Sequence, residues 1–141
     1  MALVAVVTAL WLSAPAAAEP IDRWWSGWGM GVSEYGWSGS DGSTIYITCG
    51  SERELGLRVA IRGVDPQSKT DVIFNLNGQE IRFWTTADGD IEMNSHVSMS
   101  NLFFLFDELR KGTSVFLRFD GLAKEFPLAG SAKGLGPTLC D

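Results

Sequence analysis

Residues 71–86, DVIFNLNGQEIRFWTT, decide the fold class of this chain. Two runs rich in β-branched and aromatic residues, 71–76 and 79–85, flank the dipeptide Asn77-Gly78. Asn and Gly tolerate the positive φ that both central positions of a type I′ turn require, so the stretch predicts an antiparallel β-hairpin. Asp88-Gly89 predicts a second turn leading into residues 91–93, and hence a three-stranded antiparallel meander.

Alternating apolar and polar side chains continue on both sides of this meander, which is typical of strands with one face in a core. A Trp-, Gly- and Ser-rich segment precedes the first clear alternation, and Ser/Gly composition predicts a turn at residues 38–43. Asp120-Gly121 predicts a turn within a final hairpin. The further strands expected are 28–35, 44–49, 55–62, 115–119 and 122–128.

Residues 99–111 change period and predict a helix. Their apolar side chains recur at i, i+3, i+4 and i+7, one face of a helix: Leu102, Leu105, Phe106 and Leu109. Ser98 or Ser100 suits the N-cap and Gly112 the C′ position. Arg110 and Lys111 suit the negative end of the helix dipole.

Phe103 and Phe104 widen the apolar arc of this helix, so we expect it to be covered on more than one side. A short helical turn is expected within residues 131–139. The fold class predicted is mostly β, a β-sandwich or open barrel of about seven antiparallel strands, with one packed α-helix near residues 99–111.

Residues 1–18 are typical of a secretory signal peptide. The run before Ser13 is apolar and uncharged, and Ala16-Ala17-Ala18 supplies the small residues of a cleavage site. This run is shorter than the roughly 20 residues that span a bilayer. A buried N-terminal helix and a membrane anchor are the alternatives. We therefore expect one β-rich domain over residues 19–141 in the bacterial periplasm, or alternatively secreted.

The net charge limits the partners. The chain has 11 basic and 17 acidic residues and a formal charge of −6. An acidic chain without a basic block is a poor partner for nucleic acid or for an anionic membrane surface. The partner expected is another envelope or secreted protein, and the sequence does not determine the oligomeric state.

Cys49 and Cys140 are the two cysteines. An even number of cysteines in an exported chain predicts a disulfide, and two separate thiols are the alternative. Two distant cysteines and a lone histidine make no metal ligand set, so no metal and no other cofactor is expected.

The candidates for catalysis are few. His96 is the sole histidine and sits beside turn residues. The stretch 88–92 resembles the opening of a calcium loop but lacks its later ligands. The acidic pairs considered for glycoside hydrolysis are Glu34 with Asp41 and Glu52 with Glu54. All of these fit surface turns, so we expect no enzymatic activity.

Aromatic residues offer a binding surface. Trp24, Trp25 and Trp28 are expected in the core, with protein binding or glycan binding as alternatives. Trp37 lies beside the Ser/Gly turn, and Trp84 shares its predicted strand face with charged residues. The binding surface expected is therefore Trp37, Tyr35 and Trp84.

The C-terminal third carries a family-like pattern. A helix ending at residues 109–112 leads to a strand at 115–119, then to Phe126-Pro127-Leu128-Ala129-Gly130 and a terminal Leu139-Cys140. This resembles small periplasmic proteins of the type VI secretion accessory kind and, more distantly, the invasion-associated locus B family. The resemblance implies a disulfide-bearing, non-enzymatic envelope domain with a Cys49–Cys140 bridge.

The function expected is an exported, non-enzymatic protein-binding module of the bacterial cell envelope, of accessory, inhibitor or immunity type. The alternative is a glycan- or peptidoglycan-binding module that uses exposed tryptophans.

Overall fold

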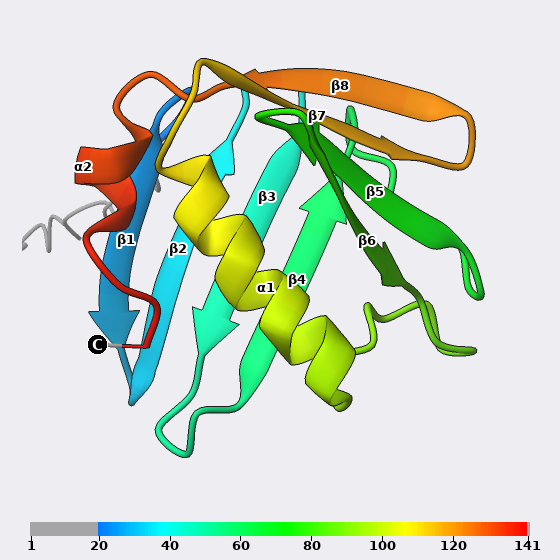
Figure 1. The fold of residues 1–141 in the computed structure, drawn as a ribbon, viewed down its shortest axis with the longest axis horizontal. Coiled ribbons are helices and arrows are strands. Elements are labelled where there is room, and N and C mark those ends of the chain that lie inside the picture. The colour runs from blue at the N-terminus through cyan, green and yellow to red at the C-terminus, as the bar shows by residue number, and fades with distance from the viewer. Residues whose placement is uncertain (1–19, 141) are drawn as a thin grey trace, which may run out of the picture.

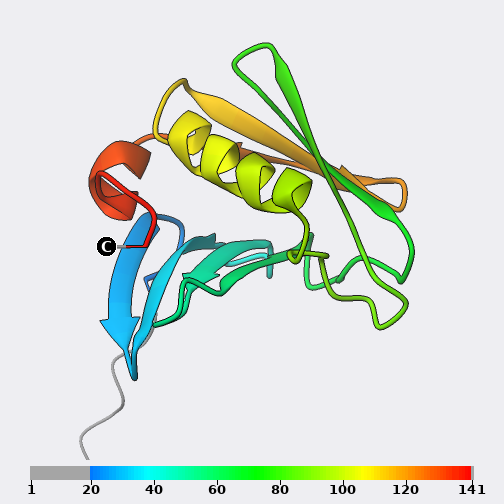
Figure 2. The same cartoon turned by 60° about the horizontal axis from the view of Figure 1, so that its bottom comes forward.

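The computed structural model describes residues 20–140. Within this range, eight antiparallel strands form two four-stranded sheets, which confirms the expected mostly β fold class. The sheets face each other, and the helix α1 lies between them (Figures 1 and 2). The predicted signal peptide, residues 1–18, lies outside the described residues.

The first sheet is a simple meander, and each of its strands pairs with the next along the chain. Its strands are β1 (Trp24–Gly29), β2 (Val32–Ser38), β3 (Thr44–Cys49) and β4 (Leu55–Ala60). The single strand expected at 28–35 is wrong, because Met30 and Gly31 form a turn with φ of 54° and 80°. Met is no turn signal, so the pattern did not reveal this hairpin.

The second sheet has the order β6-β5-β7-β8. Its strands are β5 (Asp71–Leu76), β6 (Gln79–Trp84), β7 (Ser114–Phe119) and β8 (Leu122–Pro127). Asn77 and Gly78 have φ of 51° and 73°, which confirms the predicted type I′ geometry. The third strand of the predicted meander is reduced to one isolated bridge, between Thr85 and Ile91.

The helix α1 (His96–Leu109) begins three residues before the predicted start. Its N-cap is Ser95, whose side chain accepts a hydrogen bond from the amide of Ser98, so the N-cap expected at Ser98 or Ser100 is wrong. The predicted apolar face is buried. Both sheets touch the helix: Phe106 packs edge-on against Tyr35 of β2, and Asn101 donates to the carbonyl of Arg82 in β6.

The helix is covered on more than one side, as expected, but Phe103 and Phe104 themselves remain exposed. They lie on the helix side that neither sheet reaches. Gly112 has a φ of 77°, as the predicted C′ position requires.

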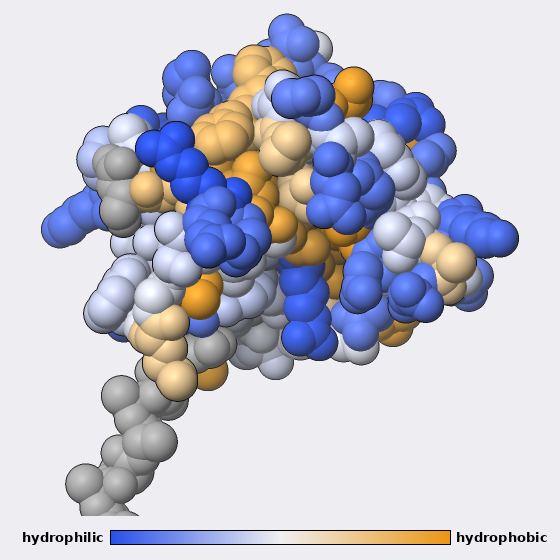
Figure 3. Space-filling model, turned by 90° about the horizontal axis from the view of Figure 1, so that it is seen from below, coloured by the Kyte–Doolittle hydropathy of each residue, from blue (hydrophilic) through white to orange (hydrophobic). Residues whose placement is uncertain are grey.

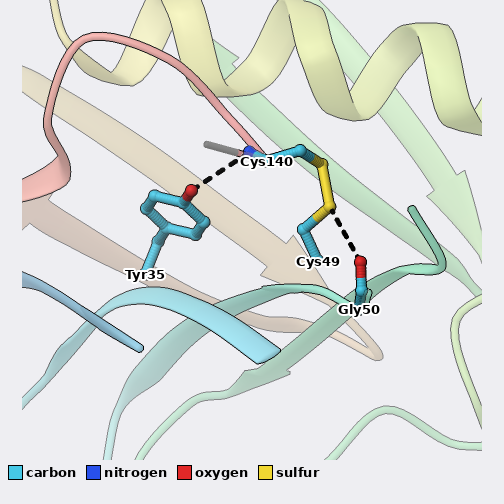
Figure 4. The surroundings of a disulfide bond; sticks show 4 residues. All are labelled: Tyr35, Cys49, Gly50 and Cys140. Carbon is cyan, nitrogen blue, oxygen red and sulfur yellow. Dashed lines mark hydrogen bonds between the residues drawn. A yellow bond between two sulfur atoms is a disulfide. The ribbon is translucent and has the colours of Figure 1, made fainter. Parts of the chain in front are cut away.

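The C-terminus returns to the first sheet. The short helix α2 (Ser131–Leu135) packs against β1, and the indole Nε1 of Trp24 donates to the carbonyl of Pro127 at 2.7 Å. Cys140 forms the predicted disulfide with Cys49 of β3, at a Cα–Cα distance of 5.3 Å. The amide of Cys140 donates to the hydroxyl of Tyr35 at 3.0 Å (Figure 4). This segment therefore closes one end of the core.

Within residues 20–140, no helix has both the length and the apolar character to cross a membrane.

Candidate functional site

Two of the three residues predicted to form the binding surface are buried. Tyr35 is 4% exposed and Trp37 is 5% exposed, so their assignment to a surface is wrong. Both lie on β2, an inner strand whose side chains alternate between core and surface, and both point into the core. Trp37 packs edge-on against Phe126 at a centroid distance of 5.2 Å. Trp84 is half-buried, on the partly exposed strand face that alternation predicted.

Among residues 20–140, the most exposed tryptophan is instead Trp28. Its side chain is 73% exposed, and the neighbouring Met30 is fully exposed at the β1–β2 turn. Trp24 is buried as expected, whereas Trp25 is half-buried and Trp28 is exposed, so the core position expected for these two tryptophans is wrong. Trp28 lies on the same side of β1 as Trp24. At Trp28, however, the strand extends beyond the part of the sheet that other elements cover.

The helix α2 covers only the beginning of β1. Gly134 lies so close to the Trp24 carbonyl that a Cβ there would approach its oxygen to 2.3 Å. Residues 26–30 beyond this contact are all exposed. A hollow of about 360 Å³ opens beside them, and its lining includes Trp28, Tyr35 and Pro137. We call residues 26–30 the β1 edge.

The β1 edge differs from the other sheet edges. Edge strands usually carry charges, proline or a covering element that prevents pairing with another chain. Arg58 lies on β4, Glu80 and Arg82 lie on β6, and Lys124 and Glu125 precede Pro127 on β8. The strand β1, WWSGWG, contains no charged residue and no proline.

Hydrogen bonds from other elements also occupy backbone carbonyls on two of the other edge strands. On β6 the Arg82 carbonyl accepts from Asn101 of α1 at 3.0 Å, and on β8 the Ala123 carbonyl accepts from Arg62 at 3.5 Å. Among the four edge strands within residues 20–140, β1 alone has no charge or proline, and its β1 edge is therefore suited to receive another strand.

A second apolar surface lies on α1. Val97, Phe103 and Phe104 are exposed there. Figure 3 shows apolar side chains gathered in the middle of the face seen from below, in the region where α1 lies between the sheets. We call these three residues the α1 face.

The candidate catalytic groups are dispersed. His96 is exposed at the first residue of α1, and both cysteines are in the disulfide. Asp41 pairs with Lys124 at 2.9 Å. This hydrogen bond, together with one from the Ser43 amide, lowers the pKa of Asp41 to about 2. Glu34 instead accepts a hydrogen bond from the hydroxyl of Tyr46, so it is not paired with Asp41.

The stretch that resembles a calcium loop has a structural role at its end. The Glu92 carboxylate accepts hydrogen bonds from the amides of Asn94 and Ser95 and from the hydroxyl of Ser98. Among residues 20–140, no group of three or more His, Cys, Asp or Glu side chains is placed to hold a metal ion.

The family model named YfjT matches residues 22–135, so the chain belongs to the YfjT family. No curated protein matches the chain, and no solved structure does. The family match does not bear on the resemblance to type VI secretion accessory or invasion-associated locus B proteins, which stays a prediction.

Proposed function

We propose that this member of the YfjT family is an exported, non-enzymatic protein-binding module of the bacterial cell envelope, of accessory, inhibitor or immunity type. The observation that supports the proposal is the β1 edge, an exposed and uncharged stretch that includes Trp28 at the end of β1 and Met30 in the following turn. Its partner is another envelope or secreted protein.

The geometry of the β1 edge favours binding by strand addition. An extended partner segment pairs with the backbone groups of an exposed edge, and pockets beside the edge take alternate side chains. The hollow next to Trp28 supplies such a pocket. Trp is also among the residues enriched in interface hot spots.

The disulfide fits an extracytoplasmic location, because disulfides persist in oxidising compartments. We place the protein in the periplasm, with secretion as the alternative. The formal charge of −6 favours a basic partner surface through complementary electrostatics. An acidic inhibitor of a basic cell-wall hydrolase is one arrangement with this complementarity.

The test is affinity capture from envelope extract with tagged protein comprising residues 19–141. Wild type is compared with Trp28→Ser/Met30→Ser, which removes the apolar end of the β1 edge. Phe103→Ser/Phe104→Ser serves as the control, because it removes two other exposed apolar side chains, those of the α1 face. Circular dichroism and thermal melting verify that each variant folds.

We expect wild type and Phe103→Ser/Phe104→Ser (the α1 variant) to capture the same dominant protein. Trp28→Ser/Met30→Ser (the β1 variant) is expected to lose it. A partner retained by the β1 variant would contradict the assignment of the β1 edge. Recovery of no protein by wild type, even at low salt, would contradict the protein-binding function.

A further inference from the structure

The outward face of the first sheet contains a row of four residues in register, one on each strand. Trp25 on β1 lies opposite Gly36 on β2, which lies opposite Tyr46 on β3, which lies opposite Arg58 on β4. Each alternates along its strand with buried core residues, so all four lie on the outer side. The row spans three strand spacings, roughly 14 Å.

The two aromatic rings of this row cover the glycine between them. Gly36 is buried although it lies on the outer side and has no side chain. The rings of Trp25 and Tyr46 approach to a centroid distance of 6.2 Å with an interplanar angle of 36°. The Trp25 ring also reaches 4.0 Å from the Cβ position of Gly27, the next outward residue on its own strand. It therefore leans along the sheet surface.

The neighbouring row of outward residues contains two glycines, which have no side chain to project from the sheet. The next outward row consists of Gly27, Glu34, Thr48 and Gly56, with a glycine at each end. Glu34 accepts the hydroxyl hydrogen bond of Tyr46 at 2.5 Å, which holds the tyrosine ring in place. The result is a half-exposed aromatic pair whose neighbouring row has a glycine at each end.

The tryptophan at position 25 carries a polar group that the fold does not pair. Its indole Nε1 is buried and has no hydrogen-bond partner among the described residues. A buried donor without an acceptor costs free energy that a phenylalanine ring would not incur. What tryptophan provides at this position, compared with phenylalanine, is a larger ring face.

Polar groups of both kinds border the aromatic pair. A hollow of about 510 Å³ adjoins Tyr46, and its lining includes Thr44, Arg58 and Asp65. Arg58 is exposed and forms no ion pair with another residue in the range 20–140. Guanidinium donors, carboxylate acceptors and hydroxyls together match the hydroxyl groups of a sugar.

We infer that Trp25, Tyr46 and Arg58 form a binding site for an uncharged pyranose oligosaccharide. The sugar rings stack on Trp25 and Tyr46, and Arg58 donates hydrogen bonds to sugar oxygens at the hollow. The net charge of −6 disfavours an acidic polysaccharide. This site lies on the outer face of the sheet, apart from Trp28 and Met30, and does not depend on the proposed protein partner.

The test uses chitotetraose as an N-acetylated probe, cellotetraose as a probe with hydroxyl groups only, and tetragalacturonate as an acidic probe. Binding to the full domain is measured by calorimetry, and the indole N–H resonances of the tryptophans are followed by NMR. We expect saturable binding of at least one uncharged probe, with the Trp25 resonance shifting most and no comparable binding of the acidic probe.

Variants separate binding from folding. Trp25→Phe is expected to keep or raise the melting temperature and yet weaken binding, because the ring face shrinks while the unpartnered N–H is removed. Arg58→Ala is expected to weaken binding about tenfold, as the loss of a charge-assisted hydrogen bond predicts. Trp28→Ser/Met30→Ser is the control and should bind the sugar as wild type does.

Three results would overturn the site. The first is the absence of saturable binding by both uncharged probes. The second is binding that persists unchanged in Trp25→Phe and Arg58→Ala. The third is binding that is lost in the β1-edge variant instead, which would place the sugar at Trp28.

Discussion

At Gly36 the absence of a side chain determines how the first sheet packs. A Cβ at this position would lie 2.6 Å from the carbonyl oxygen of Ile45, a backbone atom of the neighbouring strand that cannot rotate away. The glycine also leaves the space that the rings of Trp25 and Tyr46 occupy. The strand pairing and the aromatic pair therefore depend on the same residue.

Gly36→Ala is expected to lower the free energy of unfolding by about 1–3 kcal/mol, the usual cost of forcing an added group into a packed site. Gly27→Ala is the matched control, because its nearest neighbour is 4.0 Å from the added Cβ. That control should stay within about 0.5 kcal/mol of wild type. Urea unfolding measures both values, and equal stabilities for the two variants would refute the steric argument.

Among the elements, α1 depends most on a residue outside its own span. Glu92 precedes the helix, and its carboxylate accepts hydrogen bonds from the amide of Ser95 and the hydroxyl of Ser98. Burial alone would raise the pKa of Glu92. The hydrogen bonds from Ser98, Asn94 and Ser95 outweigh that effect and lower its pKa below the ordinary 4.5. The charged carboxylate thus holds the N-terminus of α1.

Glu92→Gln is expected to cost about 1 kcal/mol at pH 7, as the loss of a helix cap does. Because the folded-state pKa of Glu92 is lowered, its stabilising contribution is complete above the ordinary pKa and is lost as the pH falls through the folded value. The difference between wild type and variant should therefore shrink in acid. Urea unfolding at several pH values measures it, with the exposed Glu125→Gln as control.

If the difference in unfolding free energy between wild type and Glu92→Gln stayed constant from pH 7 into strong acid, the charge of Glu92 would not stabilise α1. A cost equal to that of Glu125→Gln would show the same.

For the whole molecule, the disulfide is the covalent connection between segments far apart in the chain. It joins β3 to the end of the chain across a sequence separation of 91 residues. The segment that it fixes contains α2, which covers the beginning of β1 and leaves the β1 edge open. The bridge therefore holds in place the segment whose helix α2 covers the beginning of β1.

Cys49→Ser/Cys140→Ser is expected to lose up to about 4–5 kcal/mol of unfolding free energy, because a loop of this length restricts the unfolded chain strongly. A reducing agent should lower the melting temperature of wild type and leave that of the variant unchanged. Hydrogen exchange should also increase in residues 131–140. A wild-type melting curve insensitive to reduction would contradict this role of the bridge.

The sequence predicted the local features of the fold better than the non-local ones. Asn77-Gly78 and Gly112 have the predicted positive φ, because turn and cap preferences act within a few residues. The Met30-Gly31 turn carried no such signal. The third strand expected at 91–93 has only an isolated bridge to Thr85, and the neighbouring Glu92 accepts a hydrogen bond from Ser95, the N-cap of α1.

The candidate site could not be read from the sequence in the same way. Alternation separates the two faces of a strand, but it does not show where the strand leaves the core. Tyr35 and Trp37 were expected at the surface and are buried, whereas Trp28 was expected in the core and is exposed. The Trp25, Gly36 and Tyr46 contact joins three strands and has no signature in any one of them.

The sequence by itself determined the mostly β fold class, the main helix, the I′ hairpin and the pairing of two cysteines, because these follow from local backbone preferences, side-chain period and the number of thiols. Only the tertiary structure decided which aromatic residues are buried and which sheet edge stays open. Burial is a sum over segments far apart in the chain, here α1, α2 and the closing disulfide, and no single segment contains that information.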